Sequence, residues 1–193
     1  MSSTRGAWDG SEIDEEHINV HRYHGKLPPD ELVAVRVPGA QNSTAPRDGE
    51  VVVFAEHFAR GLGLPTSRFC SRFLTHYGMQ LHHLSPNVVL QLAAFITLCE
   101  GFLGIEPCLD LWRRLFFFKQ SSVTNKATDE KQMSPCGVAL VYHFSGSGFP
   151  HLPVHDSMKN WQRGFFYVKN INSVNDHINM SAFFDALPIE KLN

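Results

Sequence analysis

Apolar side chains in the middle of the chain recur at intervals of three and four residues. Phe69, Phe73 and Tyr77 follow this spacing after a Pro65–Ser67 start, so they would share one face of a helix. Gly78 stands where the end of a helix favours a left-handed residue. The pattern predicts a helix that ends at Gly78.

A second helical signal begins at Ser85 and Pro86. Serine suits the N-cap position, and proline fits the first helical position because its missing N–H has no partner there. The following stretch, Asn87–Phe102, is apolar nearly all round. Such a helix must be covered by other elements, so we expect Asn87–Phe102 to be a buried central helix.

The next apolar run, Cys108–Lys119, places Leu111, Leu115 and Phe118 on one face. It predicts another helix, which would form a helical hairpin with the central one. The helix dipole favours cations toward the C-terminal end, where three lie: Arg113, Arg114 and Lys119.

The period changes after residues 120–135, a polar stretch that we predict to be a mobile loop. Residues 138–144 and 164–168 are β-branched and aromatic runs bounded by Gly, Pro and Asn. They predict two strands, which we expect to pair as an antiparallel ribbon. Upstream, Val51–Phe54 predicts a short strand or direct entry into a short helix from about Phe54.

These patterns predict an α+β fold that is predominantly α-helical, with a central buried helix wrapped by helices and a small antiparallel β element in the C-terminal third. Residues 1–48, rich in Pro, Gly and polar residues, predict a partly disordered arm with one short helix near residues 12–24. The globular domain would span 49–170, helical over 50–119 and β-rich over 136–170. Residues 171–193 would form a tail.

Composition fits a globular protein, with 43% hydrophobic and 19% charged residues. Seventeen basic and 19 acidic residues give a net charge of −2, which provides no general reason to expect nucleic acid or an anionic membrane as a partner. Bases exceed acids only in residues 51–120. The net charge therefore favours protein as the partner.

Three features predict an intracellular protein without a secretory signal or transmembrane segment. The first twenty residues hold no apolar h-region. The run Val88–Leu103, interrupted by Gln91, Thr97 and Glu100, is too short and too polar for a membrane span. The four cysteines form no C-x-x-C pair and predict free thiols in a reducing compartment: Cys70, Cys99, Cys108 and Cys136.

Six sequence words stand in a fixed order along the chain: Gly49–Phe54, Arg60–Pro65, His82–Asn87, Leu98–Ile105, Leu111–Phe117 and Trp161–Asn170. With these words the chain resembles the plant domain family described as "putative gypsy type transposon", over about residues 49–170. The resemblance implies a domain from the N-terminal region of retroelement-encoded proteins. It implies no biochemical activity that could be assigned to a residue.

The sequence lacks the motifs that retroelement enzymes need. There is no Asp-Asp pair for a two-metal site, and Asp156-Ser157 is followed by Met158 where an aspartic protease needs Gly. The cysteine spacing excludes a zinc knuckle, and no glycine-rich loop with lysine occurs. We expect no enzymatic activity, no cofactor and no small-molecule substrate.

Histidines and cysteines offer two weaker alternatives. His82 and His83, with Cys70 and His76, could supply metal ligands, but adjacent histidines point apart in most backbones. A thiol nucleophile would pair His143 with Cys136 or with Cys99, but Cys99 lies in the most apolar helix and is expected to be an inert core thiol. The sequence therefore predicts no catalytic, cofactor-binding or metal residues.

Two function classes remain. The favoured one is a non-enzymatic, retrotransposon-derived structural or protein-interaction domain, gag-like or an adaptor, which binds a protein partner or itself. The alternative is a nucleic-acid-binding protein that uses the basic helical segment, with aromatic residues interleaved as in single-strand binders. Its candidate contacts are Arg60, Arg68, Arg72, Arg113, Arg114 and Lys119.

Overall fold

A computed structural model describes residues 10–39, 45–119, 122–124, 131–133, 139–142, 149, 152, 160–171 and 178. The chain divides into two compact units. One, here called the sheet unit, contains the described residues up to Ser67 and those from 160 to 178. The other, the helical unit, contains the described residues from Arg68 to 152. The α+β, mostly helical fold class is confirmed.

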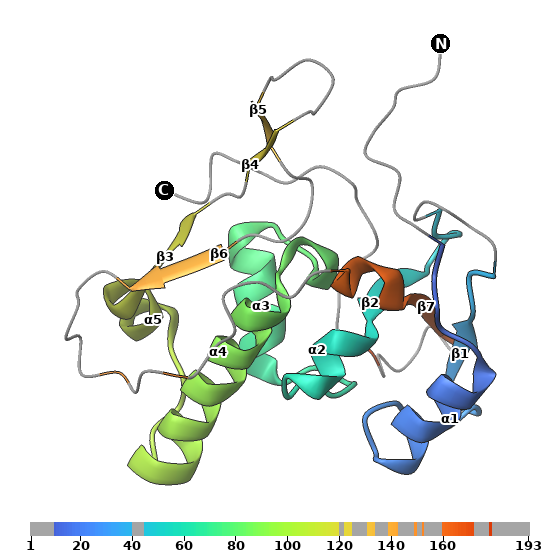
Figure 1. Cartoon of the computed structure of the whole chain (residues 1–193). Coiled ribbons are helices and arrows are strands. Elements are labelled where there is room, and N and C mark those ends of the chain that lie inside the picture. The colour runs from blue at the N-terminus through green and yellow to red at the C-terminus, as the bar shows by residue number, and fades with distance from the viewer. Residues whose placement is uncertain are drawn as a thin grey trace. The chain divides into compact units, whose positions relative to one another are not determined.

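The sheet unit is built on a three-stranded antiparallel sheet in the order β1-β7-β2 (Figure 1). Its strands are β1 (Val33–Arg36), β7 (Phe165–Asn170) and β2 (Val51–Phe54). In the central strand, Tyr167 stands opposite Arg36 of β1 and Val52 of β2. The unit also contains the helices α1 (Glu15–Tyr23) and α2 (Ala55–Ala59) and a 3-10 turn, Trp161–Gly164.

The predicted pairing of the two C-terminal strands is wrong. β7, which lies in the predicted 164–168 run, pairs instead with β1 and β2. The 138–144 run contains β6 (Ala139–Tyr142), which pairs antiparallel with β3 (Phe116–Lys119). A β-branched pattern indicates that a segment is extended, but the choice of its neighbour depends on which faces can be buried together.

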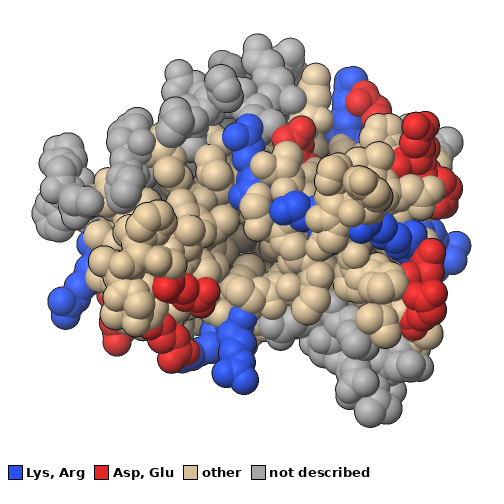
Figure 2. Space-filling model, turned by 90° about the horizontal axis from the view of Figure 1, so that it is seen from below, with Lys and Arg blue, Asp and Glu red and all other residues tan. Residues whose placement is uncertain are grey.

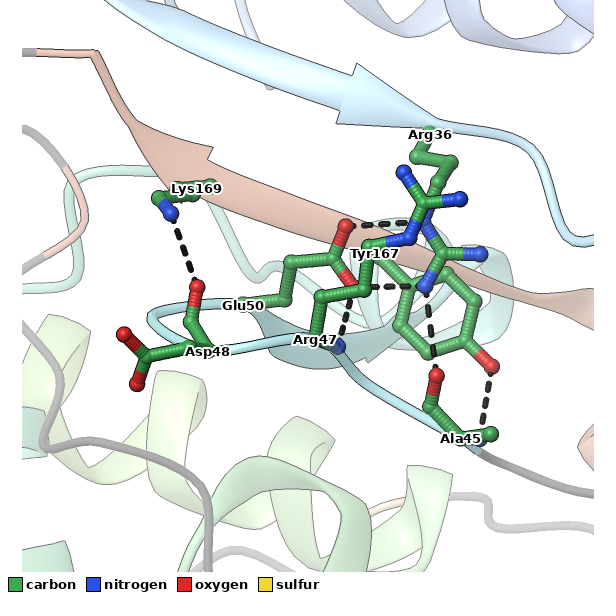
Figure 3. A network of polar contacts seen from close by, with 7 residues as sticks. All are labelled: Arg36, Ala45, Arg47, Asp48, Glu50, Tyr167 and Lys169. Carbon is green, nitrogen blue, oxygen red and sulfur yellow. Dashed lines mark hydrogen bonds and ion pairs between the residues drawn. The ribbon is translucent and has the colours of Figure 1, made fainter.

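A polar network holds the three strands of the sheet unit together on one face (Figure 3). The Arg36 guanidinium lies 3.8 Å from the Tyr167 ring centroid. It donates to both carboxylate oxygens of Glu50, through Nε at 2.7 Å and through a terminal nitrogen at 2.5 Å. The Arg47 backbone N–H also donates to Glu50, at 2.6 Å, and the Ala45 N–H donates to the Tyr167 hydroxyl at 2.9 Å. The ion pair thus bridges β1 and the start of β2 over the central strand.

The Glu50 carboxylate is ionised in this environment. Burial opposes its charge, but the hydrogen bonds from Arg36 and the Arg47 backbone outweigh burial and lower the pKa of Glu50. The hydrogen bond to Glu50 raises the pKa of Arg36 in turn. The side chains of Arg36 and Glu50 are only 19% and 8% exposed, so solvent screens this pair less than a surface ion pair.

The helical unit contains the three predicted central elements, with different ends. They are α3 (Arg68–Tyr77), α4 (Pro86–Thr97) continued by a π-helix (Leu98–Leu103), and α5 (Leu109–Leu115). A 3-10 turn, Leu81–His83, precedes α4, and the short strands β4 (Ser122–Thr124) and β5 (Lys131–Met133) pair within the predicted 120–135 loop. As predicted, Gly78 is left-handed and follows α3, and Ser85 is the N-cap of α4.

An aromatic cluster around Trp112 forms the core of the helical unit. The Trp112 side chain is fully buried, and its ring centroid lies 5.1 Å from that of Phe73, 5.2 Å from Phe95 and 4.4 Å from Phe116. Because these rings come from α3, α4, α5 and β3, their burial joins all four elements. The core therefore includes the first turns of the expected central helix.

Two predictions about helix extent are wrong. The expected buried helix Asn87–Phe102 is covered only along its first part, because Phe102 is 80% exposed. The expected helix over Cys108–Lys119 ends at Leu115, and residues 116–119 form β3. Strand geometry lets Phe116 and Phe118 enter the core while Phe117 faces outward, and β6 supplies the hydrogen-bonding partner.

Phe95 and Phe102 lie on one continuous helix, but they should respond oppositely to truncation. Phe95 is 1% exposed and sits in the aromatic cluster, so Phe95→Ala should lower the free energy of unfolding by about 3–5 kcal/mol. Phe102→Ala should change it by less than about 0.5 kcal/mol. Urea titration of both variants checks this, and equal losses would contradict the observed burial.

Glu50→Gln should destabilise the protein by about 3 kcal/mol at neutral pH, because it leaves the partly buried Arg36 without its charge partner. The folded-state pKa of Glu50 is lowered, so its contribution is present above the ordinary glutamate pKa and is lost as pH falls through the folded value. The stability gap between the wild type and Glu50→Gln should therefore stay constant above the ordinary glutamate pKa of about 4.3 and narrow as pH falls below it, toward the lower folded value. Urea titrations from pH 7 to pH 3 measure the difference, and a constant gap would contradict this role.

Candidate interaction surface

The π-helix Leu98–Leu103 carries the end of the α4 helix out of the core. The buried side chains Val88, Leu92, Phe95 and Cys99 lie three or four residues apart, so they form one stripe along the helix. Beyond Cys99 this stripe ends, since residues 100–106 are all exposed. In Figure 1 the helix projects past α3 at this end.

A glycine closes the π-helix. Gly104 adopts a left-handed backbone with φ of 63°, a conformation that residues with a Cβ rarely adopt. The backbone N–H groups of Gly104 and Ile105 both donate to the Cys99 carbonyl oxygen, the second at 2.9 Å. These bonds hold the exposed turn in one conformation, because they satisfy its backbone without solvent.

Three large apolar side chains around this turn are exposed to solvent. Phe102 is 80% exposed, Leu103 56% and Ile105 44%. We call these three residues the apolar tip. Single exposed apolar residues are common, but a contiguous group on an ordered turn is typical of an interaction site.

Acidic residues flank the apolar tip in the sequence. Glu100, Glu106 and Asp110 are exposed, and Arg72 lies 3.6 Å from Glu106 in a pair that is exposed on both sides. Figure 2, which views the molecule from below, shows tan surface with red acidic groups beside it at the end of this helix. A negative border disfavours contact of the apolar tip with phosphate groups.

The segment Pro86–Leu103 is long and apolar enough, by length and composition alone, to count as a membrane-span candidate among the described residues. From its sequence, the nearly identical run Val88–Leu103 is expected to be too short and too polar for a membrane span. One such helix is weak evidence, because core helices of soluble proteins pass the same test. The helix carries part of the aromatic core, with Phe95 buried against Trp112.

The structure separates the six predicted basic contacts into groups. Arg60 belongs to the sheet unit and caps α2. Arg68 and Arg72 are exposed on α3, where Arg72 faces Glu106. The remaining three are all exposed. Arg113 and Arg114 lie in the last turn of α5, and Lys119 lies on β3.

The two adjacent histidines are buried in the 3-10 turn before α4. Nδ1 of His83 accepts a hydrogen bond from the Gln80 backbone N–H at 3.0 Å, so this nitrogen carries no proton and the ring is neutral. His82 packs against it, with ring centroids 3.9 Å apart. Among the described residues, no group of three or more His, Cys, Asp or Glu side chains could hold a metal ion.

Sequence reasoning missed the apolar tip by assigning Phe102 to a buried helix. The signal that could have revealed it is the change at residue 100. From Glu100 onward, two glycines and two glutamates interrupt the apolar run within seven residues. Glycine weakens a helix and favours a turn, so the last apolar residues lie on the turn rather than in the core.

Comparison with known families confirms the resemblance over one segment of the chain, residues 51–120. Residues 51–120 match the sequence model of the family described as "putative gypsy type transposon". This segment runs from β2 to the end of β3 and includes the apolar tip. No curated protein and no solved structure matches the chain significantly.

Thiol reactivity tests the burial of Cys70 on α3 and of Cys99 on the π-helix. Burial raises the pKa of the Cys70 thiol to about 12, and burial also raises the pKa of Cys99, whereas Cys108 is exposed. Because the thiolate is the reactive form, iodoacetamide at pH 8 should label Cys108 much faster than Cys70 or Cys99. Peptide mass spectrometry resolves the sites, and labelling in urea is the control in which this difference should vanish. Equal labelling rates for the three thiols in native buffer would show that α3 and the π-helix are not packed as described.

Proposed function

We propose that this chain is a non-enzymatic, retrotransposon-derived domain that acts by protein–protein contact, as a gag-like structural protein or an adaptor. The family match supports the retrotransposon origin. The observation that carries the proposed contact is the apolar tip, Phe102, Leu103 and Ile105, exposed on an ordered turn. The absence of catalytic motifs from the sequence supports a role in binding.

The apolar tip has the composition of a binding hot spot. Aromatic and aliphatic side chains release about 1.5–3 kcal/mol each when they leave water completely. A partner pocket that covers Phe102 and Leu103 would gain this energy with little ordering cost, because the Gly104 turn is already closed by backbone hydrogen bonds. A rigid apolar projection therefore suits insertion into a groove on another protein.

The acidic border specifies the partner further. Glu100 and Asp110 are exposed and flank the apolar tip in the sequence, and they would repel phosphates and anionic lipid headgroups. A groove with an apolar floor and basic edges satisfies both the apolar side chains and the acids. The partner is a protein of this kind or a second copy of the chain.

Phe102→Asp tests the proposal, because it places a charge at the centre of the apolar tip. The full chain carrying an affinity tag would be expressed in plant cells, and the recovered proteins quantified by mass spectrometry. Sedimentation velocity of the purified chain measures self-association in parallel. We expect Phe102→Asp to abolish the strongest association that the wild type shows in either assay. Its midpoint of urea unfolding should equal that of the wild type.

Tyr23→Asp is the matched control, since Tyr23 is an aromatic residue that is 88% exposed in the sheet unit. This variant should associate as the wild type does. A wild-type chain that is monomeric and recovers the same proteins as Phe102→Asp would refute contact through the apolar tip.

A further inference from the structure

The helix α1 is attached to the sheet unit on both sides by backbone hydrogen bonds. Before the helix, the Glu12 N–H donates to the Arg163 carbonyl oxygen at 2.8 Å. After it, the Lys26 carbonyl oxygen accepts from the Leu64 N–H at 2.9 Å. We call residues 12–26 the α1 strap, since they are fixed at two points and carry the helix between them.

His21 supplies the aromatic contact of the α1 strap. Its ring centroid lies 4.9 Å from that of Phe58 on α2 and 6.3 Å from that of Phe166 on β7. Both phenylalanines are buried, and their own ring centroids are 5.9 Å apart. Within α1, the buried residue is Ile18, three positions before His21. The packing of α1 on α2 and β7 therefore involves a side chain that can take up a proton.

The docked position of α1 suits the neutral imidazole of His21. The side chain is half-buried, and burial against apolar rings is the largest cause that lowers the pKa of His21 below the ordinary histidine value. Positive charge on His17 and His24 lowers this pKa further. These two residues stand four positions before His21 and three after it, which places them on the same side of the helix. A proton on His21 would be both poorly hydrated and repelled.

No carboxylate compensates for that proton among the described residues. The two elements packed against His21 carry one acid and three basic or titratable side chains: Glu56, His57 and Arg60 on α2 and Lys169 on β7. None of these four is among the groups that shift the pKa of His21. On the strap, Asp14 lies 2.6 Å from the Nδ1 atom of His17. The charges that act on His21 are therefore all of one sign.

We propose that His21 is a pH-sensitive switch: α1 packs on Phe58 and Phe166 while the imidazole is neutral, and it is released when the imidazole takes up a proton. Release would uncover the two phenylalanine rings, while the backbone hydrogen bonds of Glu12 and Lys26 keep the strap attached. The switch lies within the sheet unit. It goes beyond the protein contact proposed for the apolar tip and does not depend on it.

The pH dependence of docking has a defined direction. Docked His21 binds a proton less readily than released His21, because its pKa is lowered. Docking is therefore strongest above the ordinary histidine pKa of about 6.5, and it weakens as pH falls below this value toward the docked pKa. Since one proton is taken up, the docking equilibrium constant changes by at most about tenfold per pH unit in this window.

Two measurements on the full chain test the proposal. NMR titration of the imidazole carbons gives the pKa of His21, whose signal is assigned by its loss in His21→Phe. Hydrogen exchange with mass spectrometry, corrected for the intrinsic exchange rate, gives the protection of the α1 amides from about pH 7.5 to about pH 5. We expect His21 to titrate below about 6.5. Protection of α1 should fall at least about threefold over this range.

His21→Phe keeps an aromatic ring at the contact and removes the titratable group, so the protection of α1 should become nearly independent of pH. The matched control is His76→Phe, the same substitution at an exposed histidine on α3. It should keep the wild-type pH dependence of α1.

Three results would overturn the proposal. The first is a pKa of His21 at or above the ordinary value, which a dominant cation–π contact with Phe58 would produce. The second is protection of α1 that stays constant with pH in the wild type. The third is the same pH dependence in the wild type and His21→Phe. The first two results remain decisive if His21→Phe fails to fold, because they come from the wild type alone.

Discussion

The sheet unit depends on the ion pair between Arg36 and Glu50, which crosses the central strand over the ring of Tyr167. β1 and β2 come from the first sixty residues, whereas β7 comes from residues 165–170. Closing so long a loop costs conformational entropy. Three contributions offset that cost: hydrogen bonds on both edges of β7, the buried side chains of β7 and the bridging ion pair. In this fold the Glu50 carboxylate is partly buried, and only a charged partner makes that burial favourable.

The proposed apolar tip follows from a second constraint, the limited size of the aromatic core. The core accepts Phe95 and Cys99 from one helix and Phe116 and Phe118 from one strand. Phe102 lies beyond its reach and stays exposed. The exposed acids that flank Phe102 in the sequence favour a protein partner with basic edges. The matched segment, residues 51–120, contains the apolar tip.

That segment does not contain the strands that complete it. β2 pairs with β7, and β3 pairs with β6, and both partners follow residue 120. Unpaired edge strands expose backbone groups that invite association with other chains. The residues around the matched segment therefore contribute to the fold itself, including part of what the sequence presents as an N-terminal arm, where Val33–Arg36 is a strand of the sheet.

Local signals determined much of this protein. Backbone chemistry that a segment carries by itself explains three kinds of feature. These are the start of α4 at Ser85, the left-handed glycines Gly78 and Gly104, and the extended runs 51–54 and 165–168. Local signals do not explain three other features. These are the choice of strand partners for β7 and β6, the end of burial after Cys99, and the formation of a strand by residues 116–119 where a helix is expected. Each of these depends on which other elements are present to cover an apolar face or to receive a backbone hydrogen bond. The sequence alone therefore determined where elements begin and what they could be, and only the tertiary structure decided which aromatic side chains are core and which are surface.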